Sequence, residues 1–471
     1  MSPSRLLPLG AALLACLSCS SSSSGGGGVH RFAIDSTEFP FTTPVGAPAT
    51  SQWQAATRDL SCVLLAPDDT YIEITVTIPV NIEKRDKTGK TVWTSPPITF
   101  GDPTVGFDGK CSRDGNLQTF SMAMGADGSS FLVGQVRSPS GLATPAWKLG
   151  AALVDASGKI VWAKTLDDRE AVTRMVSVLA DPSGDFLVTA SLEFSASGAI
   201  DADEYAILRV GNDGTVKKKA KVDPIHVPEY DHPGGQAPGS TVVRTTSLGT
   251  AFPLMQGMAA TKDGGFVVVG SYNFGRAIAC GTDDDPKDPT EGDSCPQQGS
   301  DGALLRYDAG LNLLWSRHYG DGYFTQLNLG HVAELGDGTF VATGSVVGGT
   351  PGQYDPPVEA LSMGIDRDGT MRWVKSHPWG KKPGATFTQG GVAFEEVVQA
   401  TAGDVDVVMA PPRGSACLLV RIHEDGTITR TQTLTESAAP FGANGRCWGV
   451  TGAKGILVRG EQTLFRFDPI P

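Results

Sequence analysis

The sequence lacks several features that would narrow its function at once. The chain has 471 residues, and after the leader it contains no apolar run of about 20 residues, the length that spans a bilayer. The G-x-S-x-G signature of serine hydrolases and the H-E-x-x-H signature of zinc peptidases are both absent. No C-x-x-C pair occurs among the six cysteines that follow the leader, which argues against zinc or thiol redox chemistry. These absences leave the fold and the cellular address open to argument, but they identify no activity.

Positive charge is also in short supply. The chain has 38 Lys and Arg against 51 Asp and Glu, a net charge of −13 and a pI near 5.0. An acidic surface repels phosphate backbones, so we expect no nucleic-acid partner. The remaining composition, 40% hydrophobic with 59 Gly and 31 Pro, is typical of a globular, turn-rich β protein.

A repeated pair of hairpins organises the chain. In the stretch Met255–Gly320, four β-rich runs meet in pairs at Asp263-Gly264-Gly265 and at Asp308-Ala309-Gly310. Glycine reaches positive φ without a Cβ clash, so such turns indicate hairpins. Copies lie on both sides, and the glycines of the second turns are 56, 96, 59 and 57 residues apart: Gly158, Gly214, Gly310, Gly369 and Gly426. This period predicts an all-β fold, a β-propeller with four antiparallel strands per blade, with a β-sandwich of unrelated hairpins as the alternative.

Six blades are the expected number, five of them continuous and one shared between the two ends. The C-terminal run CWGVTGAKGILVRGEQTLFRFDPIP supplies three strands, and Lys87–Ser95 repeats the last turn and strand of a blade. Pairing of these N- and C-terminal strands would remove exposed edges and close the ring. Seven blades follow instead if residues 55–98 build a whole blade. The propeller domain is thus placed at 60–471 with insertions at 223–252 and 273–300, after a Pro/Thr-rich extension at 32–59.

Residues 1–19 have the pattern of an export signal, with Arg5 followed by an apolar run. Leu13-Leu14-Ala15-Cys16 resembles the lipobox of bacterial lipoproteins, which implies a lipid on Cys16; Cys19, or simple cleavage before the serines, is the alternative. The Ser/Gly-rich stretch 20–31 is typical of a flexible tether.

These three features predict a cell-envelope protein, an outer-membrane lipoprotein or one on the extracellular surface, which meets the membrane through its N-terminal lipid. Mass spectrometry of the mature N-terminus should find diacylglycerol on Cys16. An unmodified peptide that begins beyond Ser20 would contradict the prediction.

The six remaining cysteines are an even number in an exported chain, which favours disulfides over buried thiols. Cys280 and Cys295 bracket one loop, and closing about 15 residues would contribute roughly 3 kcal/mol. Proximity in sequence suggests Cys417 with Cys447 and Cys62 with Cys111.

The predicted loops divide between two faces of the ring. In a four-stranded meander, the Asp-Gly turns lie on one face, while the second-to-third loops and the blade connections lie on the other. Long segments are expected on this second face, which we take as the candidate binding face. They are Arg137–Ala146, Glu193–Glu204, Val347–Val358, Pro378–Val392 and the two insertions.

Two loops contain groups that could hold a ligand. The candidate binding loop inside Cys280–Cys295 carries Asp283, Asp284, Asp285, Asp288, Glu291 and Asp293. Carboxylates suit Ca²⁺, but Lys287 breaks the EF-hand pattern, and a solvated acidic loop is the preferred interpretation. His226 and His232 could share a metal with Glu229 or Asp231, or could be surface residues. No cofactor is expected. The recurring Trp93, Trp162, Trp315 and Trp373 are interpreted as blade packing.

Three short motifs carry a family resemblance. KTGKTVW and DASGKIVW resemble the blade repeats of pyrroloquinoline-quinone-type and kelch-like propellers, and DGGFVVVGS is similar to repeats of secreted bacterial propellers. The resemblance covers roughly 60–470 and implies the fold. Quinoprotein dehydrogenases often carry a disulfide between adjacent cysteines, and this chain has no such pair. An outer-membrane assembly lipoprotein with a similar propeller is a second analogue, as a non-catalytic scaffold.

The sequence therefore favours a binding or scaffold module with a protein or glycan partner at its loop-rich face. A glycan-acting or quinone-dependent enzyme with its site at the channel mouth is the first alternative. A purely structural envelope protein is the second.

Overall fold

The chain folds into antiparallel β-sheets, as the repeat predicted. No helix long and apolar enough to cross a bilayer occurs in the part of the chain that the structure describes. The computed structural model describes residues 29–30, 35–36, 45–56, 61–66, 68, 70–75, 80–102, 105–107, 120–138, 146–167, 172–196, 199–222, 225–226, 250–251, 254–280, 293–319, 326–347, 358–377, 393–400, 403–410, 417–435, 448–452, 455–459 and 463–467.

Seven groups of four strands, here called units 1 to 7, account for most of the described residues. Within each unit, neighbouring strands pair antiparallel. Unit 1 is β5 (Ser61–Leu65), β6 (Tyr71–Thr75), β7 (Asn81–Arg85) and β8 (Thr91–Thr94); unit 2 is β10 (Phe120–Met124), β11 (Ser130–Ser138), β12 (Ala146–Val154) and β13 (Ile160–Thr165). Unit 3 is β14 (Val172–Ala180), β15 (Phe186–Ala196), β16 (Ala199–Val210) and β17 (Val216–Val222); unit 4 is β20 (Leu254–Ala260), β21 (Phe266–Cys280), β22 (Asp293–Tyr307) and β23 (Leu313–Tyr319). Unit 5 is β24 (Gln326–Glu334), β25 (Phe340–Val347), β26 (Val358–Ile365) and β27 (Met371–His377); unit 6 is β28 (Ala393–Ala400), β29 (Asp404–Ala410), β30 (Leu418–His423) and β31 (Ile428–Thr435). Unit 7 is β32 (Trp448–Gly452), β33 (Gly455–Arg459), β34 (Thr463–Phe467) and, from the other end of the chain, β4 (Trp53–Ala56). The two-residue strand β9 (Gly106–Phe107) pairs with β11, and β18 (Ile225–His226) pairs with β19 (Thr250–Ala251).

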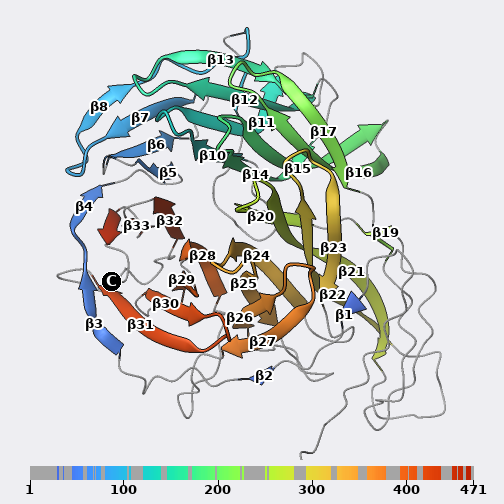
Figure 1. Cartoon of the computed structure of the whole chain (residues 1–471). Helices are drawn as coiled ribbons and strands as arrows, with labels where there is room; N and C mark the ends of the chain where they lie inside the picture. Colours follow the sequence, from blue (N-terminus) through green and yellow to red (C-terminus); the bar gives the residue numbers. More distant parts are fainter. Residues whose placement is uncertain are drawn as a thin grey trace, which may run out of the picture.

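The units surround a common centre (Figure 1). The first strand of each unit contacts the first strand of the next, in the order β5, β10, β14, β20, β24, β28 and β32, and β32 contacts β5 again. The first strands therefore line the centre of the ring, and the fourth strands form its rim.

The two ends of the chain meet in unit 7, but not through the strand that the sequence suggested. The strand in Lys87–Ser95, β8, pairs with β7 inside unit 1, so residues 61–94 build a four-stranded unit of their own. The strand that pairs antiparallel with β34 is β4, from the extension at 32–59. The sequence hid this strand because its four residues carry no turn glycine to align with the repeats.

Three short strands before β4 lie on the rim of the ring. Each adds to a fourth strand in parallel: β1 (Val29–His30) to β23, β2 (Asp35–Ser36) to β27 and β3 (Val45–Thr50) to β31. We call β1, β2 and β3 the N-terminal belt (blue in Figure 1). Over the described residues, the rim strands β8, β13 and β17 carry no added strand of this kind.

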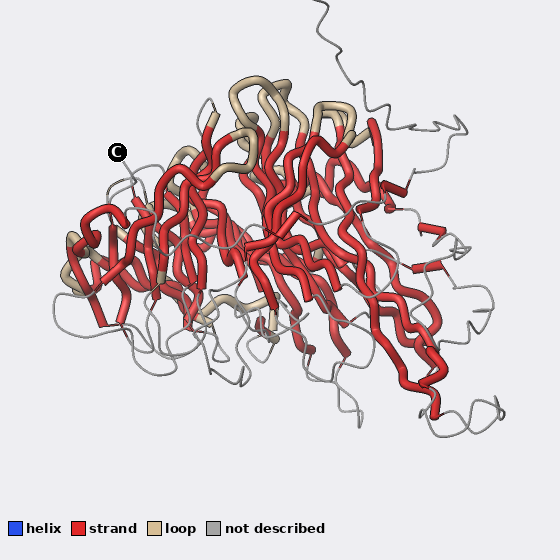
Figure 2. Tube along the Cα trace, turned by 90° about the horizontal axis from the view of Figure 1, so that it is seen from below, coloured by secondary structure: helices blue, strands red, loops and turns tan. Residues whose placement is uncertain are grey.

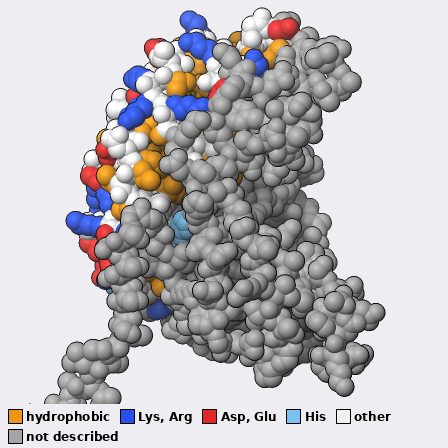
Figure 3. Space-filling view, turned by 90° about the vertical axis from the view of Figure 1, so that its right-hand side faces the viewer, with side chains coloured by type: hydrophobic (Ala, Val, Ile, Leu, Met, Phe, Trp, Pro, Cys, Tyr) orange, Lys and Arg blue, Asp and Glu red, His pale blue; other side chains and the backbone are white. Residues whose placement is uncertain are grey.

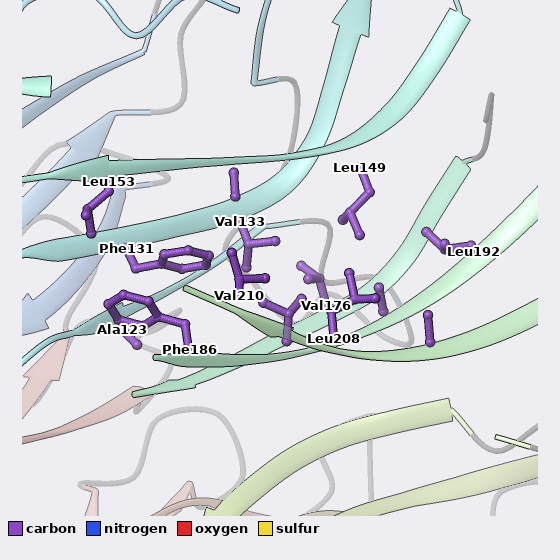
Figure 4. Close-up of a cluster of buried hydrophobic side chains, with 14 residues drawn as sticks. Ala123, Phe131, Val133, Leu149, Leu153, Val176, Phe186, Leu192, Leu208 and Val210 are labelled. Carbon is purple, nitrogen blue, oxygen red and sulfur yellow. The ribbon is translucent and has the colours of Figure 1, made fainter. Parts of the chain in front are cut away.

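Adjacent units pack through apolar side chains that point between the sheets. Between units 2 and 3, Phe131 and Phe186 stack with ring centroids 4.2 Å apart, and Val133, Leu149 and Leu208 surround them (Figure 4). Each fully buried side chain of this size contributes about 1.5–3 kcal/mol to folding. Packing between neighbouring sheets thus holds the units in the ring.

The tight turns gather on one face, as expected. Figure 2 shows most of the described loops, in tan, along one edge of the ring. Most turn glycines have φ near +80°, which L-residues rarely adopt, but Gly310 is not among them. Its neighbour Leu311 holds the position, with φ 61° and its amide bonded to the Asp308 carbonyl. The glycine alignment of the sequence analysis was therefore wrong by one residue in unit 4.

Four recurring tryptophans lock the rim strands of units 1, 2, 4 and 5 to the next unit, which confirms their interpretation as blade packing. Each indole Nε1 donates to the carbonyl two residues before the turn glycine of the next unit. A Cβ on that glycine would lie 2.6 to 3.0 Å from the nearest indole atom. These Trp latches join Trp93 to Ala156 (3.1 Å), Trp162 to Asn212 (2.6 Å), Trp315 to Arg367 (2.8 Å) and Trp373 to Glu424 (2.6 Å).

Unit 3 lacks a tryptophan at this position and meets unit 4 differently. Lys218 occupies the place of the indole and donates to the Gly310 carbonyl, while Arg209 Nη2 donates to the Ala309 carbonyl at 2.7 Å. Leu311, only 3% exposed, packs among Phe266, Tyr307 and their neighbours. The absence of the indole at position 218 and the leucine at position 311 are thus structurally coupled.

Every rim strand of units 1 to 6 is bulged shortly after its tight turn. The bulged residue has no register partner, and it turns outward. Three of the five large hydrophobic side chains that are exposed in the described chain are bulged residues: Val92 (56%), Val161 (52%) and Leu314 (52%). Their exposure follows from the bulge and does not by itself mark a binding patch.

Two of the predicted loops are strands. Within Glu193–Glu204, β15 and β16 continue their pairing, with one register shift, up to the Ala196–Ala199 pair. In the insertion 273–300, β21 and β22 extend their pairing to Cys280 opposite Asp293. Backbone pairing continues the strands here, and length alone was a poor sign of a loop. The segments 139–145, 348–357 and 378–392 of the other predicted loops lie outside the described residues.

Candidate functional site

Neutral polar side chains connect units 3, 4 and 5 near their first strands. Ser177 Oγ on β14 donates to the carbonyl of Gln256 on β20 at 3.1 Å. The Gln256 amide donates to Ser271 Oγ at 3.3 Å, and Ser271 Oγ lies 3.5 Å from Asn328 Oδ1 on β24. We call Ser177, Gln256, Ser271 and Asn328 the polar row.

Three members of the polar row, Gln256, Ser271 and Asn328, lie toward the ends of their units away from the Asp-Gly turns. The turn between β20 and β21 is on the Asp-Gly face, so both strands reach the opposite face at their other ends. Gln256 is near the start of β20, and Ser271 pairs with Leu254, the first residue of that strand. Asn328 is likewise near the start of β24. These three residues are therefore closer to the face on which long connections were predicted.

The backbone is unusually tight beside the row. A Cβ on Gly257 would lie 2.3 Å from the carbonyl oxygen of Gly330 on the next unit. Only glycine fits there, so this contact sets the spacing between β20 and β24 and with it the position of Gln256 relative to Asn328.

Burial along the row is graded. Ser177 and Ser271 are 7% and 1% exposed, whereas Gln256 and Asn328 are half-buried. His331, 6% exposed, follows Asn328 on the same strand. The site thus offers amides and hydroxyls, which donate and accept hydrogen bonds, next to buried side chains.

A buried serine–histidine pair lies farther out, on the third and fourth strands of unit 5. Ser362 Oγ and His377 Nε2 are 2.8 Å apart. Burial, assisted by the charge of Lys375, lowers the pKa of His377 to about 4. The imidazole is therefore neutral at pH 7. It is buried within the sheet of unit 5.

This pair makes stability depend on pH. The unfolded His377 binds a proton with a pKa near 6.5 and the folded one near 4, so stability is fully present above about pH 6.5 and falls as the pH drops toward 4. Relative to the non-titrating variant His377→Gln, the native protein should lose on the order of 2 kcal/mol of unfolding free energy between pH 7.5 and pH 5. Urea denaturation at the two pH values measures this, and equal losses in both proteins would refute it.

Two buried charged pairs lie within single sheets. Arg421 makes two contacts, at 2.7 and 2.9 Å, with the buried Asp406 carboxylate, and the pKa of Arg421 is raised by this bond. In unit 1, Arg85 Nε lies 2.9 Å from the carboxylate of Glu73, which is 2% exposed. On the surface seen in Figure 3, basic and acidic side chains are interspersed along the described rim. No single-sign stripe suited to a polyelectrolyte is seen on that side.

Most residues of the predicted ligand loops lie outside the described residues. These are Asp283, Asp284, Asp285, Asp288, Glu291, Glu229, Asp231 and His232, together with Cys16 and Cys19. Asp293 opens β22 and His226 closes β18, with the His226 backbone opposite Thr250. Among the described side chains, no group of three or more potential ligands is placed to hold a metal. The calcium alternative for the acidic loop stays a prediction.

The cysteine pairings also stay predictions. Cys62 and Cys417 are buried and disulfide-bonded, but Cys111 and Cys447 lie outside the described residues. In the β21–β22 register, Cys295 is opposite Ile278 and Cys280 is opposite Asp293. In the β21–β22 pairing, the two cysteine positions are therefore diagonal neighbours and not a direct cross-strand pair.

Sequence reasoning missed the polar row. The signal was a polar residue inside the apolar first strand of a repeat, as in SVLADPSG for Ser177 and MQGMAAT for Gln256. The binding face was predicted from the long loops, and the short strands were interpreted only as packing elements.

Comparisons with known proteins give structural likeness only. No family model matches, and no curated protein matches. Among solved structures, an ulvan lyase of polysaccharide lyase family PL25 superposes with TM-score 0.46 and 8% identity, over 89% of this chain and 94% of that chain. The GH93 α-L-arabinofuranosidase of Fusarium graminearum gives 0.41 and 11%, over 76% and 94%. An α-L-arabinanase of Penicillium chrysogenum gives 0.38 and 11%, over 74% and 92%. These are propeller-like all-β proteins that act on glycans.

Proposed function

We propose that the chain is a seven-bladed β-propeller that binds a neutral glycan at the loop-rich mouth of its channel. The contacts of the first strands, which run from β5 around to β32 and back to β5, support a closed ring of seven blades. The pairing of β4 with β34 supports closure by the two ends of the chain. The proposal adopts the seven-blade alternative in place of the six-blade count.

The polar row is the observation that carries the binding proposal. Sugar hydroxyls both donate and accept hydrogen bonds, and amide and hydroxyl side chains match them in both roles. A few such groups at a rigid concave site fix the orientation of a ligand. The row contains no lysine or arginine, and the chain has a net charge of −13, so an uncharged glycan fits better than an anionic one.

The test is to titrate the full-length protein with neutral oligosaccharides of four to six units (xylan, arabinan, mannan and cellulose fragments) and with oligogalacturonate. We expect calorimetric binding to at least one neutral series, weakened about tenfold or more in Gln256→Leu. Ser157→Ala, on the exposed Asp-Gly face, is the matched control and should bind like the native protein. Binding to none of the neutral series, or equal binding by the Gln256 variant, would overturn the proposal.

The same samples separate binding from catalysis. A growing amount of reducing ends or of unsaturated sugars during incubation would identify the protein as a glycan-acting enzyme with its site at the channel. A stable, uncleaved complex would identify it as a binding module.

The cellular setting is proposed from the sequence alone. A lipid on Cys16 and the tether at 20–31 would hold the propeller at the cell envelope, where exported glycans are found. The N-terminal belt would then connect this tether to the rim of the ring beside β23.

A further inference from the structure

Exposed apolar side chains gather on one part of the rim. The large hydrophobic side chains that are exposed in the described chain all belong to the fourth strands of units 1 to 4: Val92, Val161, Val216, Leu313 and Leu314. Each follows a turn residue of positive φ by two or three positions, so all are near the Asp-Gly face. At the bulged positions of units 5 and 6, the chain has Arg372 and Thr429 instead.

The rim strands of units 2, 3 and 4 are neighbours because each one bonds to the next unit. Trp162, beside Val161, donates to the Asn212 carbonyl in the turn that precedes β17. Lys218 donates to the Gly310 carbonyl in the turn that precedes β23. The starts of β13, β17 and β23 therefore lie side by side. We call six of their side chains the rim patch: Val161, Val216, Lys217, Lys219, Leu313 and Leu314.

The rim patch combines apolar side chains with positive charge. Strands β13, β17 and β23 contain no Asp or Glu, although the whole chain has a net charge of −13. The Nζ atoms of Lys217 and Lys219 lie 2.7 and 3.1 Å from carboxylate oxygens of Asp185 and Asp167. Both lysines are partly exposed, and an ammonium has three donors, so each can also contact a further anion. Figure 3 shows hydrophobic and basic side chains close together along the described rim.

The N-terminal part of the chain leads toward the same place. Strand β1 pairs in parallel with the last two residues of β23. Because the two strands run in the same direction, the N-terminal end of β1 points toward Leu313 and Leu314 at the start of β23. A segment as long as residues 17–28 reaches up to about 40 Å when extended. A bilayer that holds the proposed lipid on Cys16 is therefore within reach of the rim patch. This step alone rests on the proposed lipid.

We propose that the rim patch rests on an anionic phospholipid bilayer. The leucines and valines enter the boundary between headgroups and acyl chains, and the two lysines bind lipid phosphates. A second copy of the chain fits less well, because a two-fold contact would bring the lysines of both copies together. In this orientation the Asp-Gly side of units 2 to 4 faces the bilayer, and the loop-rich face is directed away from it.

The test uses the chain from Ser20 to Pro471, which contains every described residue but neither the leader nor Cys16 and Cys19. It is sedimented with vesicles of phosphatidylcholine, alone or mixed in equal parts with phosphatidylglycerol. We expect binding to the mixed vesicles that is about tenfold or more tighter than to phosphatidylcholine alone. Added salt should weaken it, because salt screens the attraction between lysine and phosphate.

Two pairs of variants test the two components of the rim patch. Lys217→Gln with Lys219→Gln should weaken binding to the mixed vesicles about tenfold. The matched control, Arg372→Gln with Lys375→Gln, removes the same charge from the belt-covered β27 and should bind like the native protein. Leu313→Ser with Leu314→Ser should weaken binding about fivefold or more, whereas Leu313→Met with Leu314→Met should retain it. Melting curves check that each variant is folded.

Three results would overturn the proposal. They are equal sedimentation with both kinds of vesicle, unchanged affinity in the lysine or the serine variants, and a dimer in the absence of vesicles that Leu313→Ser with Leu314→Ser dissociates. The last result would make the rim patch a contact between copies. The glycan proposal depends on Gln256 and not on the rim patch, so either proposal can fail while the other stands.

Discussion

Exchanging Lys218 for Trp and Leu311 for Gly will cost much less stability together than the sum of the two single changes. Lys218→Trp alone should destabilise the protein by about 1–3 kcal/mol, because the indole would be crowded by the Leu311 side chain. In the other units the indole faces a glycine, which has only a hydrogen at that position. Leu311→Gly alone should cost about 1–3 kcal/mol, since the loss of a buried leucine exceeds the relief of its positive φ. The pair recreates a Trp latch.

A double-mutant cycle by urea denaturation measures the coupling, which we expect to be at least about 1 kcal/mol in favour of the pair. The matched control is the reverse exchange at an existing latch, Trp162→Lys with Gly214→Leu, which should show coupling of the same sign. Additive effects in both cycles would mean that the indole and the turn glycine are not partners.

Removal of β4 will destabilise the whole ring, while removal of the belt strands before it will not. A chain that starts at residue 51 loses β1, β2 and β3, whose pairing is short and peripheral. A chain that starts at residue 58 also loses β4 and leaves the edge of β34 unpaired beside Leu464 of the packed cluster between units 7 and 1. We expect the first to melt within a few degrees of the native protein, and the second roughly 10 °C lower or with aggregation.

Calorimetry and size-exclusion chromatography decide between these outcomes. Equal melting of the two shortened chains would show that β34 does not need β4. Equal losses in both would show that the belt, and not the closing strand, holds the ring.

The repeats could be predicted because they depend on local chemistry. The Asp-Gly turns need positive φ, and four residues later the Trp latches need a flat side chain, so both leave a fixed spacing in the sequence. Where one partner of that pair changed, as in Leu311, the alignment slipped by one residue. At positive φ a leucine is usually less favourable than glycine. The absence of the facing indole in unit 3 explains why Leu311 is accommodated.

The missing strand and the polar row could not be predicted in the same way. β4 pairs with a strand more than 400 positions away, and nothing in Trp53–Ala56 specifies that partner. The polar row depends on the meeting of three different units, through the carbonyl of Gln256 and the contact of Gly257 with Gly330. Such contacts arise only when different units pack together, and no single repeat specifies them.

The pairing of β4 with β34 also sets an order in time. β4 leaves the ribosome more than 400 residues before its partner β34. Units 1 to 6 can each complete their four strands as the chain emerges, but β4 must wait until the whole stretch between it and β34 has emerged. During that interval an early strand has exposed backbone groups, and anything that captures it would delay its pairing with β34. Folding of this protein should therefore depend on a holding factor more strongly than that of a protein whose four-stranded units are all continuous in sequence.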